Sequence, residues 1–322
     1  PLLAGSGSPA ELLRQRLKEL LARREAHYAS FSIQIDTSQR TLEQVAWELQ
    51  ARLGDFHITG MGRSYDALVR PGGLNRLGEL LRVRGLAGPL VLVSDSNVTP
   101  LYASGALTSL SAAGFAVHSI DLPAGEQHKT IASVERLWSG FLEAGLDRSS
   151  AVLALGGGVI GDLAGFAAAT YLRGVRWVGL PSSLLAMVDA SLGGKTGADL
   201  PQGKNLVGAF HPPALVLADP NLLYTLPPGE LRSGLAEVVK HGVIGDPELF
   251  RLCEQGWEAV NANLDEIVRR AMAVKIRVIE QDPYEQGQRA ALNLGHTLGH
   301  AIELASDFRL RHGEGVAIGM LA

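Results

Sequence analysis

Short apolar runs that alternate with helical segments constrain the fold of this chain more than any other feature of its sequence. Four runs bounded by Gly, Asp or Pro have the composition of buried parallel strands: 89–95, 151–155, 177–180 and 215–218. Helical segments separate them near 100–113, 131–144 and 161–172. This order predicts an α/β fold, with a Rossmann-like domain over residues 54–220.

The two ends of the chain have a different character. After residue 220 nearly every segment favours a helix: 228–242, 264–281, 289–305 and a last one from His312, which predicts an all-helical domain over 221–322. Residues 1–53 predict a short α/β appendage with a helix over 10–24, a strand over 31–36 and a second helix from an N-cap at Thr41 to Leu53. The chain starts and stops abruptly, so we expect it to be a segment of a longer polypeptide.

Composition excludes several classes of function. The 322 residues are 46% hydrophobic and 19% charged, with a net charge of −4, which favours a folded protein with a small-molecule partner over one that binds nucleic acid or an anionic membrane. One cysteine, Cys253, excludes a disulfide framework within the chain and favours a reducing compartment. The sequence shows no apolar run of about 18 residues and no signal peptide. We therefore expect a cytoplasmic protein.

A glycine-rich turn, Gly156-Gly-Gly-Val-Ile-Gly-Asp162, follows the apolar run 151–155 and opens a helix. Glycines let the backbone approach a phosphate closely, and the free N–H groups at a helix start favour its negative charge. The alternative is a tight strand-to-helix connection without a ligand. Asp95 and Asn97 end another strand, where they would either bind a ribose or cap the following helix.

Four residues in the last third have the chemistry of a metal site. Glu237 supplies a carboxylate, and the imidazoles of His296, His300 and His312 are groups that zinc prefers. His296 and His300 share one helical face because they are four residues apart. Histidines in the core or on the surface, with Glu237 on a solvated face, remain the alternative.

A second polar stretch contains Lys195, Thr196, Lys204 and Asn205. Lys195-Thr196 would end a nucleotide-binding P-loop, but that template requires glycine at the position of Asp189, which excludes it. Lysines in such turns instead hold phosphate or carboxylate groups. Further cationic and amide side chains that could face the same cleft are Arg173, Lys275, Arg289 and Asn293.

From about residue 60 onward the chain resembles 3-dehydroquinate synthase, a member of the sugar phosphate cyclases. The resemblance rests on motifs in the family's order: Asp95-Ser-Asn97, Pro123-Ala-Gly-Glu126-Gln-His-Lys129, Gly156 to Asp162, Tyr171-Leu-Arg173-Gly, Met187-Val-Asp189 to Gly197, Gly203-Lys204-Asn205, Ala236-Glu237-Val-Val-Lys240, Asn293-Leu-Gly-His296 to His300, and His312-Gly-Glu-Gly. It covers about four fifths of the chain.

This resemblance assigns roles to residues. It implies that Glu237, His296 and His312 hold a metal, zinc or cobalt, with His300 beside them. It implies that NAD is bound by Asp95, Asn97, Glu126, Lys129, Gly157, Gly158, Val159, Asp162, Ser182 and Lys204. The residues implied to act on the substrate are His300, Lys195, Asp189, Asn205, Arg173, Lys240, Lys275, Arg289 and Asn293.

The activity implied by the resemblance is the conversion of 3-deoxy-D-arabino-heptulosonate 7-phosphate to 3-dehydroquinate and phosphate, with NAD used and regenerated. Valiolone-type and deoxyinosose-type cyclases are alternatives, against which Arg289 and Asn293 favour a substrate with a carboxylate. A metal-dependent alcohol dehydrogenase is disfavoured by the lysines between Gly194 and Asn205. A catalytically inactive scaffold is disfavoured by the presence of all three ligands.

Residues 1–53 carry a second resemblance, to the C-terminal tail of shikimate kinase. It rests on Arg24-Glu-Ala-His-Tyr28, in which Ala26 replaces the proline usual in that motif. The resemblance implies a fusion with an upstream kinase domain. The synthase resemblance further implies a homodimer.

Overall fold

The computed structural model describes residues 8–306 and 309–322, and contacts divide the chain into two compact units, Pro1–Arg52 and Leu53–Ala322. Residues 1–7 of the expected appendage lie outside the described residues. In the first unit, α1 (Pro9–Ala29) begins at a capping box between Ser8 and Glu11, and α2 (Leu42–Leu53) follows Thr41. The strand predicted over 31–36 is wrong: this segment bends at 31–32 and continues as irregular chain, and it pairs with no strand in the described part of the unit.

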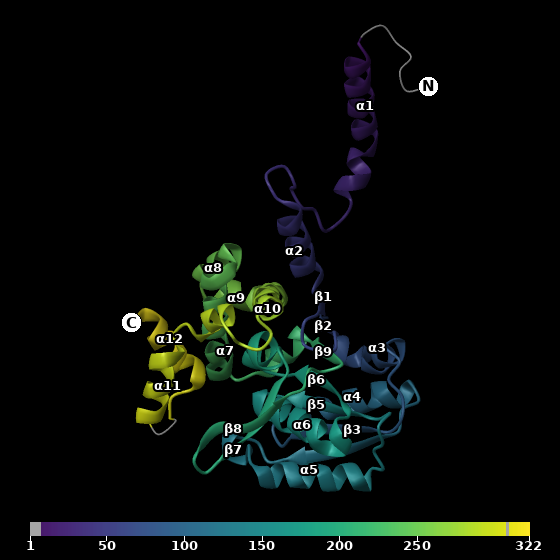
Figure 1. The fold of residues 1–322 in the computed structure, drawn as a ribbon. Helices are drawn as coiled ribbons and strands as arrows, with labels where there is room; N and C mark the ends of the chain where they lie inside the picture. Colours follow the sequence, from purple (N-terminus) through teal and green to yellow (C-terminus); the bar gives the residue numbers. More distant parts are fainter. Residues whose placement is uncertain (1–7, 307–308) are drawn as a thin grey trace. The chain divides into compact units, whose positions relative to one another are not determined.

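The second unit contains a seven-stranded sheet (Figure 1). In spatial order the strands are β1 (Asp55–Ile58), β2 (Tyr65–Val69), β9 (Leu215–Ala218), β6 (Arg176–Pro181), β5 (Ala151–Gly156), β3 (Leu90–Asp95) and β4 (Val117–Leu122). Only the β1–β2 pair is antiparallel. The predicted α/β class and its four apolar strands are confirmed. Sequence patterns missed β4 because it is mostly exposed and polar.

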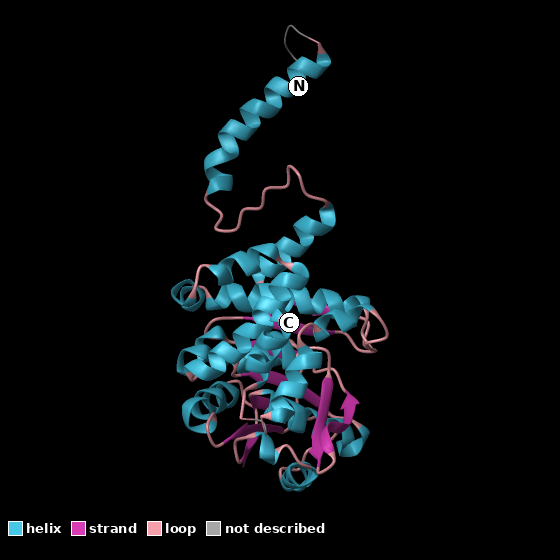
Figure 2. Cartoon of the chain, turned by 90° about the vertical axis from the view of Figure 1, so that its left-hand side faces the viewer, coloured by secondary structure: helices cyan, strands magenta, loops and turns pink. Residues whose placement is uncertain are grey.

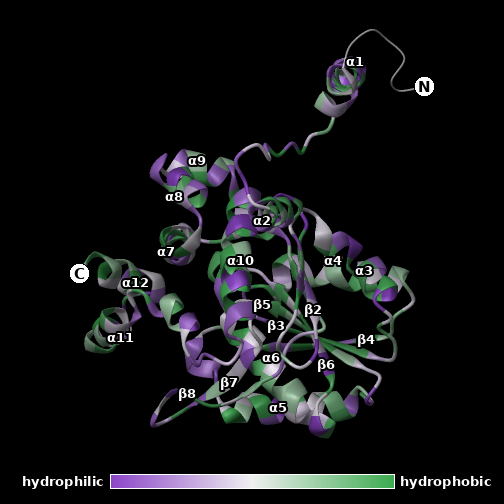
Figure 3. Cartoon of the chain, turned by 45° about the horizontal axis from the view of Figure 1, so that its top comes forward, coloured by the Kyte–Doolittle hydropathy of each residue, from purple (hydrophilic) through white to green (hydrophobic). Residues whose placement is uncertain are grey.

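Helices cover this sheet and bury its apolar runs (Figure 2). They are α3 (Leu77–Val83), which follows the short turn η1 (Gly73–Arg76), then α4 (Thr99–Ala112), α5 (Ile131–Glu143) and α6 (Gly158–Thr170). α6 packs against β3, β5 and β6, whose hydrophobic residues are visible in Figure 3. Each fully buried Leu or Val stabilises the fold by roughly 1.5–3 kcal/mol, so burial of these side chains holds α6 on the sheet.

The polar stretch after Asp189 forms a two-stranded ribbon that the sequence patterns did not predict. A π-helical turn, η4 (Ala186–Ala190), leads into β7 (Lys195–Leu200) and β8 (Gly203–Phe210), which pair antiparallel. The ribbon packs against α5 and α6. Glycines at 197 and 208 face each other in this ribbon and allow the two backbones to approach closely.

The remaining chain is helical, as predicted. Its helices are η5 (Pro220–Thr225), α7 (Pro228–Gly245), α8 (Pro247–Glu254), α9 (Trp257–Ala262), α10 (Leu264–Gln281), η6 (Gln288–Asn293), α11 (His296–Ala305) and α12 (His312–Leu321). The continuous helix predicted over 289–305 is wrong because Gly295 breaks it with a φ of 79°. A Cβ at Gly295 would lie 2.6 Å from the Val316 carbonyl oxygen, so the break lets α11 pack closely on α12. No helix among the described residues is long and apolar enough to cross a membrane.

Candidate active site

Three separate helices bring one carboxylate and two imidazoles together. Glu237 lies in the middle of α7 and is fully buried, while His296 and His312 are the first residues of α11 and α12. α12 approaches α7 closely at Gly313, where a Cβ would lie 1.9 Å from the Ser233 carbonyl oxygen. We call the group Glu237, His296 and His312 the histidine corner.

The geometry of the histidine corner suits a divalent metal. Glu237 Oε1 lies 3.7 Å from His296 Nε2 and 3.5 Å from His312 Nε2, and one atom of each side chain lies within 4.8 Å of the other two. These distances are long for hydrogen bonds, and Glu237 Oε1 has no hydrogen-bond partner among the described residues. Burying an unpaired carboxylate oxygen is costly, and a metal bound by the three groups would remove that cost.

Outer contacts fix which nitrogen of each imidazole faces Glu237. His296 Nδ1 is 3.2 Å from the Leu294 carbonyl oxygen, and His312 Nδ1 is 2.9 Å from Glu303 Oε1. Each oxygen accepts, so Nδ1 is the donor in both rings, and Nε2 is the nitrogen that a neutral ring would offer to a metal. Glu303, which sequence patterns missed, lies two turns after His296 on α11, and this spacing was the available signal.

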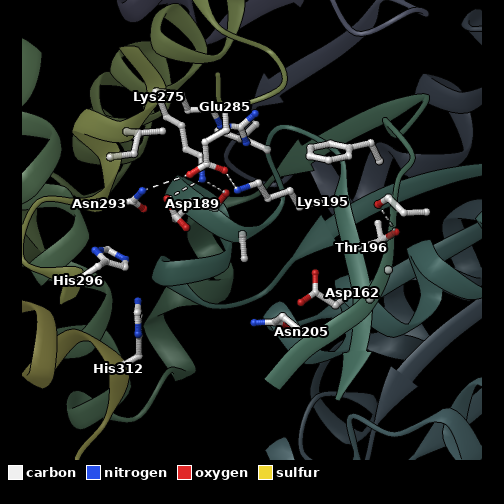
Figure 4. A pocket seen from close by; sticks show the side chains of 18 of the residues that line it. Asp162, Asp189, Lys195, Thr196, Asn205, Lys275, Glu285, Asn293, His296 and His312 are labelled. Atoms are coloured by element: carbon white, nitrogen blue, oxygen red, sulfur yellow. Dashed lines mark hydrogen bonds and ion pairs between the residues drawn. The ribbon is translucent and has the colours of Figure 1, made fainter. Parts of the chain in front are cut away.

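His300 lies one turn beyond His296 but does not belong to the histidine corner. Its ring is exposed and lies 5.9 Å from that of His312. It groups with Glu303 and His312 rather than with Glu237. His300 thus lines the cavity beside the corner (Figure 4 shows its neighbours His296 and His312).

A cavity of about 600 Å³ opens next to the histidine corner. Cationic and amide side chains converge on it from the ribbon, from α7 and α10, and from the segment before α11 (Figure 4). Predicted site residues that line it are Asp162, Asp189, Lys195, Asn205, Lys240, Lys275, Arg289, Asn293, His296, His300 and His312. Sequence motifs separated by more than a hundred residues therefore meet in one place.

Two nearly buried lysines shape the charge on this cavity. Lys240 pairs with Glu237, and Lys275 Nζ donates to Asp189 Oδ1 at 2.6 Å and to its backbone carbonyl at 2.7 Å. Burial alone would raise the pKa of Asp189, but Lys275 and Lys240 hold that pKa far below its usual value. Burial lowers the pKa of Lys275, and Asp189 offsets part of this shift.

Glu285 is a cavity residue that the sequence patterns missed. Its carboxylate pairs with Lys195 and accepts a hydrogen bond from Asn293 Nδ2 at 3.2 Å. It has a left-handed φ of 60°. The only signal was its place in a polar segment ahead of Arg289, a pattern shared by many surface turns.

His241 is a third residue that was missed, after Glu303 and Glu285. It is fully buried beside Lys240, and its Nε2 lies 4.0 Å from Asp189 Oδ1. Burial, with the neighbouring lysine, lowers its pKa to about 3, so the ring is neutral.

The residues predicted to bind NAD gather at the carboxyl ends of the central strands. Asp95 ends β3, the 156–158 glycines join β5 to α6, and Ser182 follows β6. The strand order reverses between β3 and β5, because β3 connects to β4 on one side and β5 lies on the other. Ligands of open α/β sheets bind at this switch point.

Side-chain contacts at the switch point join several predicted residues. Lys129 Nζ lies 2.6 Å from Asp162 Oδ2, and Lys204 Nζ lies 3.4 Å from Glu126 Oε1. Burial raises the pKa of Asp162 to about 6 despite the nearby Lys129. Asp95 Oδ1 accepts the backbone N–H groups of Asn97 and Val98 in the turn before α4. The N-cap of α4 is Val98, without a side-chain cap, so Asp95 does not cap that helix. Gly157 is the N-cap of α6, and Gly158 and Val159 are its first two residues.

Arg173 is the one predicted substrate residue that the structure places away from the others. It lies in η3 (Tyr171–Arg173), is exposed, and does not line the cavity. The physical reason is the length of α6, whose 13 residues carry the chain about 20 Å from the switch point.

Comparisons with known proteins agree with this architecture. The family model 3-dehydroquinate synthase N-terminal matches residues 119–233, and 3-dehydroquinate synthase C-terminal matches residues 234–322. The 3-dehydroquinate synthases of Gloeobacter violaceus and Symbiobacterium thermophilum are each 51% identical to this chain, over 80% of it and over 73% and 74% of their own lengths.

Two solved structures share the fold at lower identity. A 2-deoxy-scyllo-inosose synthase complexed with carbaglucose-6-phosphate, NAD⁺ and Co²⁺ is 30% identical, with a TM-score of 0.77 over 83% of this chain and 73% of that one. The 2-epi-5-epi-valiolone synthase of Streptomyces hygroscopicus with NAD⁺ and Zn²⁺ bound is 32% identical, with a TM-score of 0.71 over 80% of this chain and 73% of that one.

Proposed function

The chain belongs to the 3-dehydroquinate synthase family, and we propose that it converts 3-deoxy-D-arabino-heptulosonate 7-phosphate to 3-dehydroquinate and phosphate. It is then an NAD- and metal-dependent carbon–oxygen lyase. The observation that carries the proposal is the histidine corner at the edge of a cavity lined by Lys195, Lys240, Lys275 and Arg289. Such a cavity suits a substrate with a phosphate, a carboxylate and neighbouring hydroxyls.

We infer that Glu237, His296 and His312 hold zinc or cobalt. The unpaired Glu237 oxygen and the two fixed imidazole lone pairs support this ligand set, as do the Co²⁺ and Zn²⁺ bound by the related cyclases. A divalent metal at this position supplies Lewis acidity, which polarises substrate hydroxyls and makes them easier to oxidise. Lys240 keeps Glu237 ionised for this task, since its ammonium group pairs with the carboxylate.

NAD is proposed to bind at the switch point. The backbone of Gly157, Gly158 and Val159 begins α6, and its free N–H groups suit a pyrophosphate. Around them lie the remaining proposed contacts, Asp95, Asn97, Glu126, Lys129, Asp162, Ser182 and Lys204. NAD supplies a hydride acceptor that is regenerated within the cycle, so no NADH is released.

The chain's own side chains bind and orient the substrate. Lys195, Arg289 and Asn293 come from the ribbon and from the segment before α11, and they offer donors to anionic groups. Asp189, Lys240, Lys275 and His300 also line the cavity, where they can hold or pass protons. These groups hold the flexible sugar in one conformer, which favours each step of the proposed reaction in turn. When substrate binds, Lys195 must release the Glu285 carboxylate and pair with an anionic group of the substrate instead.

The division of the second unit at residue 220 is also a proposal. Residues 54–220 form the sheet and the switch point, and residues 221–322 supply all three members of the histidine corner. We therefore assign NAD binding to the first part and metal binding to the second. The two parts pack as one compact unit in this structure.

The test is phosphate release from 3-deoxy-D-arabino-heptulosonate 7-phosphate, with NAD and zinc supplied and the product checked by mass. We expect dehydroquinate, one phosphate per turnover and no accumulation of NADH. A hexose 6-phosphate, which lacks the carboxylate, serves as the competing substrate. If the protein binds NAD and zinc but turns over only the hexose phosphate, the substrate belongs to the other cyclases and our assignment is wrong.

Three further proposals concern context. We propose that residues 1–53 are a shikimate-kinase-like tail, supported by the Arg24 to Tyr28 motif and by the separate unit that the first 52 residues form. ATP-dependent phosphorylation of shikimate by the parent polypeptide would test this fusion. Sedimentation velocity would test the proposed homodimer, and cell fractionation the proposed cytoplasmic location.

A further inference from the structure

We propose that Asp199 is a positioning residue that fixes Asn205 in the cavity and links it to the cofactor segment around Lys129. The inference rests on the proposed function, in which Asn205 faces the substrate. Asp199 carries no role in the sequence motifs above. Its position in the ribbon explains why Asn205 needs a contact of this kind.

The ribbon is irregular where Asn205 lies. Ala198 pairs with Val207 and Leu200 pairs with Gly203, so Asp199 alone faces the segment 204–206. An irregularity of this kind leaves backbone groups without ladder partners. Asn205 also adopts a left-handed φ of 56°, a conformation that costs free energy for a residue with a side chain. Its conformation therefore depends on contacts from outside the strand pairing.

Asp199 supplies those contacts on two sides. Its Oδ1 accepts the backbone N–H of Asn205 at 2.7 Å and so replaces the missing ladder partner. Its own backbone N–H donates to the Lys129 carbonyl at 2.7 Å, and the segment forms a parallel bridge from Asp199 to Thr130. One residue thereby ties the irregular part of the ribbon to the chain at Lys129.

Lys129 then sets the orientation of the Asn205 amide. Its Nζ donates to Asn205 Oδ1 at 2.6 Å and pairs with Asp162 Oδ2 at the same distance. An ammonium group has only donors, so the Asn205 oxygen must face it. The Asn205 amide nitrogen, with two donors, is left for the cavity, across which lie His296 and His312 (Figure 4).

This arrangement predicts how changes at Asp199 affect the enzyme. Asp199→Ala removes the acceptor, and we expect kcat/KM for the sugar phosphate to fall about 10- to 100-fold, since small misplacements of a substrate-binding group cost this much. NAD affinity should stay within about threefold, because Asp199→Ala leaves the ion pair between Lys129 and Asp162 in place. Asp199→Asn keeps an oxygen for the Asn205 N–H and should restore most of the activity. Gln202→Ala, at the exposed tip of the same ribbon, is the matched control.

A readout independent of catalysis separates this inference from the proposed function. The backbone amide of Asn205 should exchange with solvent about tenfold or more faster in Asp199→Ala, but not in Asp199→Asn or Gln202→Ala. The inference is overturned if the exchange rate is unchanged, if Asp199→Asn is as impaired as Asp199→Ala, or if NAD affinity falls together with activity. A wild-type protein without activity on the sugar phosphate would refute the proposed function, and amide exchange alone would then decide whether Asp199 holds Asn205.

Discussion

The switch point and the histidine corner are assembled in opposite ways. At the switch point the backbone groups proposed to face the pyrophosphate lie in one continuous segment, from the end of β5 into α6. The histidine corner takes one side chain from each of three helices, and the first and last of these are 75 residues apart in sequence. A site made from backbone is as stable as its local fold. A site made from distant side chains depends on helix packing and on outer contacts, so the two should respond differently to substitution.

The largest expected effect is the loss of a corner ligand. His312→Ala should lower metal affinity and activity by more than about 100-fold, since even outer contacts of a metal site contribute 10- to 100-fold. NAD binding should persist, because the switch point shares no residue with the corner. Metal analysis and phosphate release measure the first effect, and calorimetry with NAD the second. His118→Ala, at an exposed histidine on β4, is the control. Full metal content in His312→Ala would show that the ligand set is wrong.

The next largest effect tests whether the hydrogen bond between Glu303 and His312 orients the histidine corner. Glu303→Ala removes the acceptor of His312 Nδ1, and we expect metal affinity to fall about 10- to 100-fold. Glu303→Gln keeps an acceptor oxygen and should lose much less. Competition with a chelator measures both affinities. Equal losses in the two variants would indicate that charge, and not the direction of the hydrogen bond, is what Glu303 supplies.

Substitutions at two adjacent glycines test whether the backbone at the switch point binds NAD. A Cβ at Gly157 would meet only Ser183 Oγ at 3.7 Å, so Gly157→Ala should fold normally but obstruct the phosphate and lower NAD affinity about tenfold or more. A Cβ at Gly156 would lie 2.6 Å from Ile160 Cβ, so Gly156→Ala should lower the free energy of unfolding by about 1–3 kcal/mol. Thermal unfolding and NAD titration separate the two. Unchanged NAD affinity in Gly157→Ala would remove the backbone from the proposed cofactor site.

The same contrast explains what the sequence could predict. Buried parallel strands and the turn at Gly156 follow from local composition, and they were placed to within one or two residues. The corner residues were proposed from ligand chemistry and resemblance, but their meeting depends on the break at Gly295 and the close packing at Gly313, which no local pattern reveals. Glu285 and His241 were missed because a single polar residue in a helix or turn has no periodic signal, whereas Glu303 was missed although it lies two helical turns after His296. Arg173 was grouped with the cavity by resemblance alone, although the helix predicted over 161–172 already placed it at the end far from the switch point.

The smallest effect concerns the pH dependence of stability at the switch point. Burial raises the pKa of Asp162 from its ordinary value of 3.8 to about 6, so between these pH values the folded protein holds a proton that the unfolded chain releases. This contribution is fully present below the unfolded pKa and is lost as the pH rises through about 6, by on the order of 2 kcal/mol. Asp162→Asn cannot lose a proton, so between pH 4 and pH 7 its free energy of unfolding should fall less than that of the wild type by this amount. Urea unfolding of the NAD-free proteins at both pH values measures the difference. Parallel curves for the two proteins would mean that Lys129 already keeps Asp162 ionised, and that the switch point, like the histidine corner, is organised around a fixed charge.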